Sequence, residues 1–368
     1  MSARFRDGWI FSVREDLAVF VGPLVLAGAL AGALAATGGD PAGMPPWTFL
    51  VLVVGCDVAH VHATLFRTYL DPEERRRRRG LLTAVPLAAL AIGVLLYSTS
   101  AATFWRALAY VAAFHFVRQP WGWMAYAARR AGETSRFDRR LDALAIHAAT
   151  LYPLVWWHGH LPRAFAWFVD GDFAAGLPSV GVTVALVLHV AILAAWVARQ
   201  AALLATGRPV NRAKAVILGS TWLAWTAGIV WFDADLVFTA TNVLVHGVPY
   251  AALVHRWGRS RFRDAPGLVA SFFRPGRVLA FVGVLVAIAF VEEGLWDRLV
   301  WHEHGAYFPG PSVPLGDDVL AFVVPLLAVP QATHYVLDAF VWRTRRGNPG
   351  LSRALDLDAG PTSASGAT

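Results

Sequence analysis

Long apolar stretches, separated by short charged or turn-forming loops, follow one another along almost the whole chain. A helix of about 20 apolar residues crosses the hydrocarbon core of a bilayer. Ten stretches fit that pattern, at residues 17–37, 47–70, 81–98, 103–127, 141–157, 177–198, 213–231, 235–255, 278–294 and 317–342. We therefore expect an all-α, polytopic transmembrane helix bundle. Residues 1–350 should form one bundle domain, and residues 351–368 a disordered cytoplasmic tail.

Composition supports the membrane class. Hydrophobic residues make up 57% of the chain and charged residues 15%, and the mean hydropathy is +0.49. A soluble domain of 368 residues does not need so much apolar surface for its core. Cys56 is the only cysteine, which excludes disulfides, cysteine-rich zinc sites and iron–sulfur clusters within one chain.

The arginines concentrate in every second loop between the ten predicted spans. The loops after even-numbered spans, the amino terminus and the tail hold most of them, whereas the opposite loops hold only Arg163 and Arg298. Because cytoplasmic loops collect basic residues, both termini should be cytoplasmic, in a multi-pass protein of the cell inner membrane. The net charge of +7 then describes a lipid-facing basic collar, and nucleic acid is not an expected partner.

Histidines recur inside the predicted spans at one depth. Most lie seven to ten residues from the nearest basic border, which corresponds to roughly 10 to 15 Å along a helix. Neutral imidazole without thiolate suits Fe, Cu or Zn and disfavours Mg or Ca. The pattern predicts a shared metal site with the candidate ligands His60, His62, His115, His147, His189, His246 and His334.

Other polar residues lie three or four positions from these histidines, and so on the same helix faces. We expect Asp57 and Asp338 to orient imidazoles or to bind the metal directly. Arg118 should balance charge or hold a substrate oxygen. The remaining members of these polar stripes, expected to contact bound oxygen species, are Gln119, Tyr250 and Gln331.

Two histidines fit the shared site badly. On an ideal helix His62 points about 200° away from His60, and His255 about 180° away from His246. A kink at Pro249 would correct the second, while the first needs local distortion or a separate role. The outer loops also carry two His-x-His pairs, His158/His160 and His302/His304, for which both a second metal site and a polar surface feature remain open.

A purely structural reading is also open. Intramembrane histidines often serve as interhelical hydrogen-bond donors. An ion pair of Arg118 with Asp57 or Asp338 would offset much of the roughly 2.5–3.5 kcal/mol that each charge costs at mid-bilayer. Such a pair leaves the common depth of the histidines unexplained.

The stretches GCDVAHVHATLF, FHFVRQPWGW, NVLVHGVPY and PQATHYVLDAFVWR resemble the histidine-rich integral-membrane non-haem iron oxygenases. This group includes fatty-acyl desaturases and hydroxylases and the bacterial Brp/Blh-type carotene-cleaving enzymes. The chain lacks the His-x-x-His-His boxes of the desaturases, and its histidines lie inside spans, so it is most similar to the Brp/Blh type. The resemblance implies an iron site that oxidises a lipophilic substrate.

We therefore expect a membrane-embedded oxygenase that acts on a carotenoid or fatty-acyl substrate entering from the membrane lipid. The histidines are enough for two iron ions, which we expect, or for one ion and a histidine-bearing substrate site. A cytoplasmic electron donor would be a partner if the reaction is a monooxygenation. Zinc and haem are alternative cofactors. The alternative functions are a haem- or quinone-linked electron-transfer protein and a proton-coupled transporter.

Overall fold

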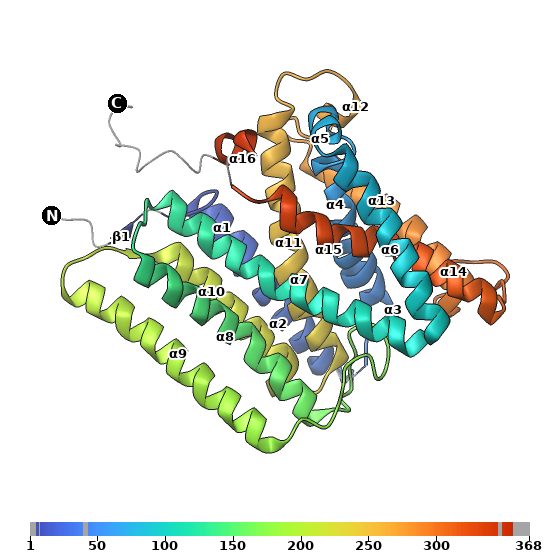
Figure 1. Cartoon of the computed structure of the whole chain (residues 1–368), viewed down its shortest axis with the longest axis horizontal. Helices are drawn as coiled ribbons and strands as arrows, with labels where there is room; N and C mark the ends of the chain where they lie inside the picture. Colours follow the sequence, from blue (N-terminus) through green and yellow to red (C-terminus); the bar gives the residue numbers. More distant parts are fainter. Residues whose placement is uncertain (1–4, 7, 40–42, 345–347, 356–368) are drawn as a thin grey trace.

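The computed structural model describes residues 5–6, 8–39, 43–344 and 348–355. These residues are almost entirely helical, which confirms the all-α prediction (Figure 1). A two-residue parallel pair joins β1 (Phe5–Arg6) to β2 (Val210–Asn211). In chain order the helices are α1 (Val13–Phe20), α2 (Gly22–Ala36), α3 (Pro46–Thr48), η1 (Phe49–Val58), α4 (Ala59–Arg67), α5 (Pro72–Arg77), α6 (Arg79–Thr99), α7 (Ala101–Arg130), α8 (Arg136–His160), α9 (Ser179–Ala205), α10 (Arg212–Trp225), η2 (Thr226–Trp231), α11 (Asp235–Arg261), α12 (Leu268–Ser271), α13 (Val278–Trp296), η3 (Asp297–Trp301), α14 (Asp317–Leu327), α15 (Val329–Val341) and α16 (Pro349–Ala354).

Eight helical segments among the described residues are long and apolar enough to cross a membrane. They are Val13–Ala36, Pro46–Arg67, Arg79–Thr99, Ser179–Ala205, Arg212–Trp231, Asp235–Arg261, Val278–Trp301 and Asp317–Val341. Each coincides with one of the ten predicted spans. The other two predicted spans fall on α7 and α8, which are 30 and 25 residues long. These two helices are long enough to cross a membrane, but they are not among the segments that are also sufficiently apolar and poor in charged residues. The helices are compatible with a multi-pass membrane protein, while the count of ten, the orientation of the termini and the particular membrane stay predictions.

The helices form two neighbouring groups around α11 (Figure 1). On one side α7, α8, α9 and α10 lie next to one another, with α9 at the edge. On the other side α4, α6, α13 and α14 pack together, and α15 lies against α4, α6 and α7. α4, α7 and α11 thus meet near α15, so four helices from distant parts of the chain can place side chains in one interior space.

Residues exposed on the outside of the bundle are strongly apolar. On α9 the exposed side chains include Val180, Val184, Val187, Leu188 and Val197. A soluble monomer rarely exposes so continuous an apolar face. This surface is the one that lipid would cover.

Buried ion pairs fasten the helix ends on the predicted cytoplasmic side. The ammonium of Lys214, 3% exposed as a residue, lies 2.7 Å from Glu133 Oε2 and 2.8 Å from Asp142 Oδ2. Arg67 pairs with Glu74 and donates to the carbonyl oxygen of Val341 at 2.9 Å. The first network joins α8 and α10 to the segment before α8, and the second joins α4, α5 and the end of α15.

The last predicted span is two helices. The chain breaks at Ala328, between α14 and α15, where Pro330 occupies the first turn of α15, a position that tolerates a missing N–H. By contrast, Pro249 does not end α11, which runs from Asp235 to Arg261. At the carboxyl end α16 reaches Ala354, and residues 356–368 of the predicted disordered tail lie outside the described residues.

Candidate metal centre

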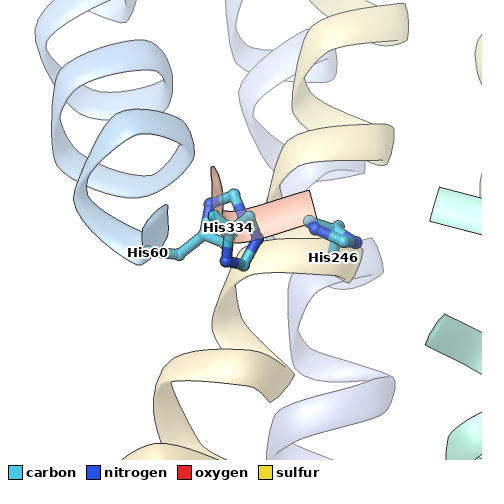
Figure 2. A group of neighbouring side chains, drawn as sticks. All are labelled: His60, His246 and His334. Atoms are coloured by element: carbon cyan, nitrogen blue, oxygen red, sulfur yellow. The ribbon is translucent and has the colours of Figure 1, made fainter. Parts of the chain in front are cut away.

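Four imidazoles meet in the interior of the bundle, each from a different helix. They belong to His60 of α4, His115 of α7, His246 of α11 and His334 of α15, and each residue is at most 6% exposed. Successive ring centroids lie 4.7–5.0 Å apart around a closed ring, in the order His60, His246, His115, His334. Figure 2 shows three of them, His60, His246 and His334, turned toward one another. We call these residues the four-histidine cluster.

The Nε2 atoms of the cluster have no partner. All four are buried, and none makes a hydrogen bond with any part of the chain that the structure describes. A buried polar atom without a hydrogen bond costs about 1–3 kcal/mol. Four such atoms in one place indicate a ligand that takes their lone pairs.

The hydrogen bond of His60 shows which of its nitrogens has the lone pair. Its Nδ1 lies 3.2 Å from the carbonyl oxygen of Cys56, one turn earlier. A carbonyl only accepts, so Nδ1 must carry the proton and donate. Nε2 of the neutral ring is then the atom with the free lone pair, and it faces the other histidines.

His334 is oriented in the same way through side chains. Its Nδ1 lies 2.7 Å from Thr64 Oγ1, which lies 2.8 Å from the hydroxyl of Tyr250. Tyr250 in turn donates to Asp338 Oδ1 at 2.7 Å. In a consistent arrangement of protons, Nδ1 of His334 donates to Thr64, Thr64 donates to Tyr250, and Tyr250 donates to the carboxylate of Asp338. This arrangement protonates Nδ1 and leaves Nε2 of His334 as a metal ligand.

Two overlapping groups of three potential ligand atoms lie close together at the cluster. One potential ligand atom from each of His60, His246 and His334 lies within 4.8 Å of the other two. The same holds for a second, overlapping group of His115, His334 and Asp338. Metal–nitrogen bonds of about 2.1 Å in a tetrahedral site place the ligand atoms roughly 3.4 Å apart. A contraction of up to about 1.4 Å, by changes in side-chain torsions, would close such a group on an ion.

Local packing explains how the helices come so close. Gly247 lets α11 approach η1, because a Cβ there would lie 2.9 Å from Cys56 Sγ and 3.4 Å from His60 Nδ1. Phe116 stacks on His246 with centroids 3.7 Å apart, and Tyr335 packs on His115 at 4.9 Å. These rings hold two of the imidazoles in place.

The other three histidines predicted as ligands contact groups outside the cluster. Nε2 of His62 lies 2.8 Å from Glu292 Oε2 of α13, close enough for an ion pair when the ring is protonated, although the two groups are not aligned as a hydrogen bond. His62 thus has a role separate from the cluster, one of the two explanations that its direction, about 200° away from His60 on the helix, left open. Nδ1 of His147 lies 2.7 Å from the carbonyl oxygen of Ala143 in its own helix.

His189 has both ring nitrogens engaged. Its Nδ1 donates to the carbonyl oxygen of Ala148 at 2.8 Å, and its Nε2 accepts from Trp222 Nε1 at 3.2 Å. It therefore serves as an interhelical hydrogen-bonding residue between α8, α9 and α10. The outer histidine His158 is also engaged, with Tyr110 and with the carbonyl oxygen of Leu154.

Some of the polar residues predicted to assist the site lie beside the cluster, and others do not. Asp57 Oδ1 lies 3.9 Å from His60 Nδ1 and Asp338 Oδ1 lies 3.7 Å from His334 Nδ1, so both flank the cluster. Gln119 donates to the carbonyl oxygen of His246 at 3.3 Å. Gln331 is half-buried on α15, one turn before His334, whereas Arg118 is exposed on α7. The exposure of Arg118 does not fit the predicted role at the site, although its i+3 spacing from His115 placed it near the same helix face.

Sequence reasoning missed the residues that support the histidines. Thr64 lies four residues after His60 and so on the same face, a spacing that could have identified it. Trp342 donates to the hydroxyl of Tyr250 at 3.4 Å, and Tyr335 and Phe116 pack on imidazoles. These aromatic residues carry no sequence signal that separates them from ordinary core residues.

In comparisons with known proteins, no family model, no curated protein and no solved structure matches the chain.

Proposed function

We propose that the protein is a membrane-embedded, metal-dependent oxygenase in which one iron ion is held by His60, His115, His246 and His334. The observation that carries the proposal is the convergence of four buried, unpartnered Nε2 atoms. Four neutral imidazoles without a thiolate suit iron, copper or zinc. Zinc in hydrolytic enzymes usually has three protein ligands and a water, so a set of four histidines favours iron. The four ligands supply one ion, which is fewer than the two expected from the seven candidate histidines.

Iron supplies the capacity to activate dioxygen at such a site. The chain supplies the rest. Thr64 holds His334 in the tautomer that leaves Nε2 free, and the carbonyl oxygen of Cys56 does the same for His60. The surrounding apolar helices exclude water, which protects reactive species from side reactions.

Tyr250 is a phenol that lies beside the cluster. Its ring centroid lies 5.0 Å from that of His334 and 5.8 Å from that of His60. Its hydroxyl connects Thr64 to Asp338. We propose that this phenol donates and recovers a proton at the site, with Asp338 as the group that exchanges it.

A haem protein is a poorer fit to the geometry. Axial ligation needs two imidazoles on opposite faces of a porphyrin. In the four-histidine cluster each ring has a neighbour 4.7–5.0 Å away on both sides. Whichever pair were axial, the other two rings would fill the plane that the porphyrin requires.

The test is isotopic. The iron-loaded protein in nanodiscs of cellular lipid is supplied with ¹⁸O₂ and a reductant, and the extracted lipids are analysed by mass spectrometry. We expect ¹⁸O in a lipid product with the wild type and with His147→Ala, and none with His334→Ala. Equal labelling by wild type and His334→Ala would contradict the proposal, as would lipids that stay unlabelled with fully iron-loaded wild type.

A further inference from the structure

A cavity of about 340 Å³ runs from the four-histidine cluster toward the predicted cytoplasmic side. At its inner end it is lined by His60, Cys56 and Gly247, and at its outer end by Arg256 and Arg259. Gly247 and Arg259 are twelve residues apart on α11, so the cavity extends roughly 18 Å along that helix. Its length and position connect the metal site with the basic border of the bundle.

The walls of this cavity are apolar. Its middle part is lined by α1, α4, α11 and α13, with side chains that include Val19, Ala59, Ala252, Phe281 and Leu285. Small residues on α4 and α11 leave the space, and larger ones on α13 close it. A volume near 300 Å³ is at the small end of ligand pockets, which suits one hydrocarbon chain better than a two-chain lipid or a bulky ring system.

Next to the outer end lies a second, polar hollow of about 250 Å³. Arg256 and Arg259 line both hollows, and Arg263 and Arg274 complete the second. Glu15 is the acidic residue at the mouth of the first. Among the described lining residues, Arg259, Arg263 and Arg274 outnumber the single carboxylate of Glu15 and favour an anion here. Basic pockets between helices on the cytoplasmic side favour lipid headgroups.

Between the two ends lies an imidazole with a free nitrogen. His255 lines the apolar cavity, and its buried Nε2 makes no hydrogen bond with the residues that the structure describes. This histidine, half a turn away from His246 on the helix, is not part of the metal site. A polar atom of a ligand near the mouth of the cavity would give it a partner.

We propose that this cavity binds a single-chain lipid with an anionic headgroup, such as a fatty-acid carboxylate, with the tail toward His60 and the head among Arg256, Arg259, Arg263 and Arg274. As the substrate of the iron site, this ligand rests on the proposed function, and it selects a fatty-acyl substrate over a carotenoid. A carotenoid hydrocarbon has no group for the arginines to bind. The arginines at the outer end of the cavity and the apolar path of about 18 Å that leads from them to His60 together fit an amphiphile.

Binding of radiolabelled oleate to iron-loaded protein in detergent tests the proposal directly. We expect Arg259→Gln combined with Arg263→Gln to weaken oleate binding by roughly tenfold or more, since charge-assisted hydrogen bonds are lost. Ala252→Phe and Val282→Trp, which fill the cavity from two different helices, should weaken it to a similar degree. Arg139→Gln, exposed in the first turn of α8, and Ala194→Phe, exposed on α9, are matched controls that should bind oleate as the wild type does.

Two competitors separate the headgroup from the tail. Oleyl alcohol, which has the same chain without the charge, should displace oleate much less well than unlabelled oleate does, and inorganic phosphate should not displace it at millimolar concentration. Equal competition by the alcohol, displacement by phosphate alone, or wild-type affinity in the arginine and cavity variants would overturn the proposal.

Iron content, measured on the same samples, distinguishes failure of this proposal from failure of the proposed function. Protein that holds iron on the four histidines but does not bind oleate contradicts the lipid site alone. Protein that binds oleate through these residues but holds no iron contradicts the oxygenase alone.

Discussion

Thr64 Oγ1 lies 2.7 Å from Nδ1 of His334, across the contact between α4 and α15. This hydroxyl fixes the ring orientation and tautomer of a proposed metal ligand, as partners of ligating histidines generally do. Thr64→Val keeps the shape and removes the hydroxyl. We expect it to lower iron affinity about 10- to 100-fold, measured by competition with a chelator. Thr64→Ser should keep the wild-type affinity, and an equal loss in the serine variant would show that packing, not the hydrogen bond, matters.

Tyr250 provides a test of the proton path. Tyr250→Phe removes the group between Thr64 and Asp338 while keeping the ring. We expect iron content to stay at the wild-type level and the turnover of the oxygenation to fall by about 10²-fold, as for loss of an acid–base group. The check is ¹⁸O incorporation per bound iron. Tyr307→Phe, outside the cluster, is the control; unchanged turnover in Tyr250→Phe would remove the phenol from the reaction.

Gly247 allows the close approach of α11 and η1. In Gly247→Ala the added methyl would lie 2.9 Å from Cys56 Sγ, so the helices must move apart. Overpacking of this kind costs about 1–3 kcal/mol. The variant should unfold at a lower temperature and bind less iron. Gly219→Ala, where a Cβ meets nothing within 4 Å, should be as stable as the wild type or more so, and the same behaviour in Gly247→Ala would contradict the packing argument.

Lys214 pairs with two carboxylates, those of Glu133 and Asp142, at the end of the bundle. Lys214→Met leaves Asp142, whose side chain is 4% exposed, as an uncompensated buried charge. Breaking a buried pair in this way costs about 3–5 kcal/mol, which denaturation in mixed micelles would measure. Lys214→Arg keeps the charge and should lose less stability. Iron content per folded chain should not change, because Lys214 supports the helix ends and not the cluster.

The sequence predicted the helices well, since these follow from the length of the hydrophobic stretches. It could not predict which histidines meet. His189 resembles His246 in depth and surroundings along the chain, yet Trp222 of another helix occupies its Nε2. His62 finds Glu292, 230 residues away, and Arg118 turns outward. Helix rotation and contacts between distant segments decide these roles, and the sequence of a single helix does not contain that information.

The same limit applies to the support of the site and to the cavity. Thr64 shares a face with His60, but its contact with His334 depends on how α15 breaks away from α14. The cavity beside His60 exists because Gly247, Ala252 and Ala59 from two helices face Phe281 of a third. Neither feature is a property of a single apolar stretch.

Iron per chain in the purified protein and its histidine variants tests the central claim most directly. With the wild type and the control His147→Ala we expect about one iron per chain, since four imidazoles in one cluster can serve one ion and still leave positions open for dioxygen. The variants His60→Ala, His115→Ala, His246→Ala and His334→Ala should each lose most of it while remaining folded. A wild type without metal after iron-supplemented expression, or full occupancy in these four variants, would contradict the account.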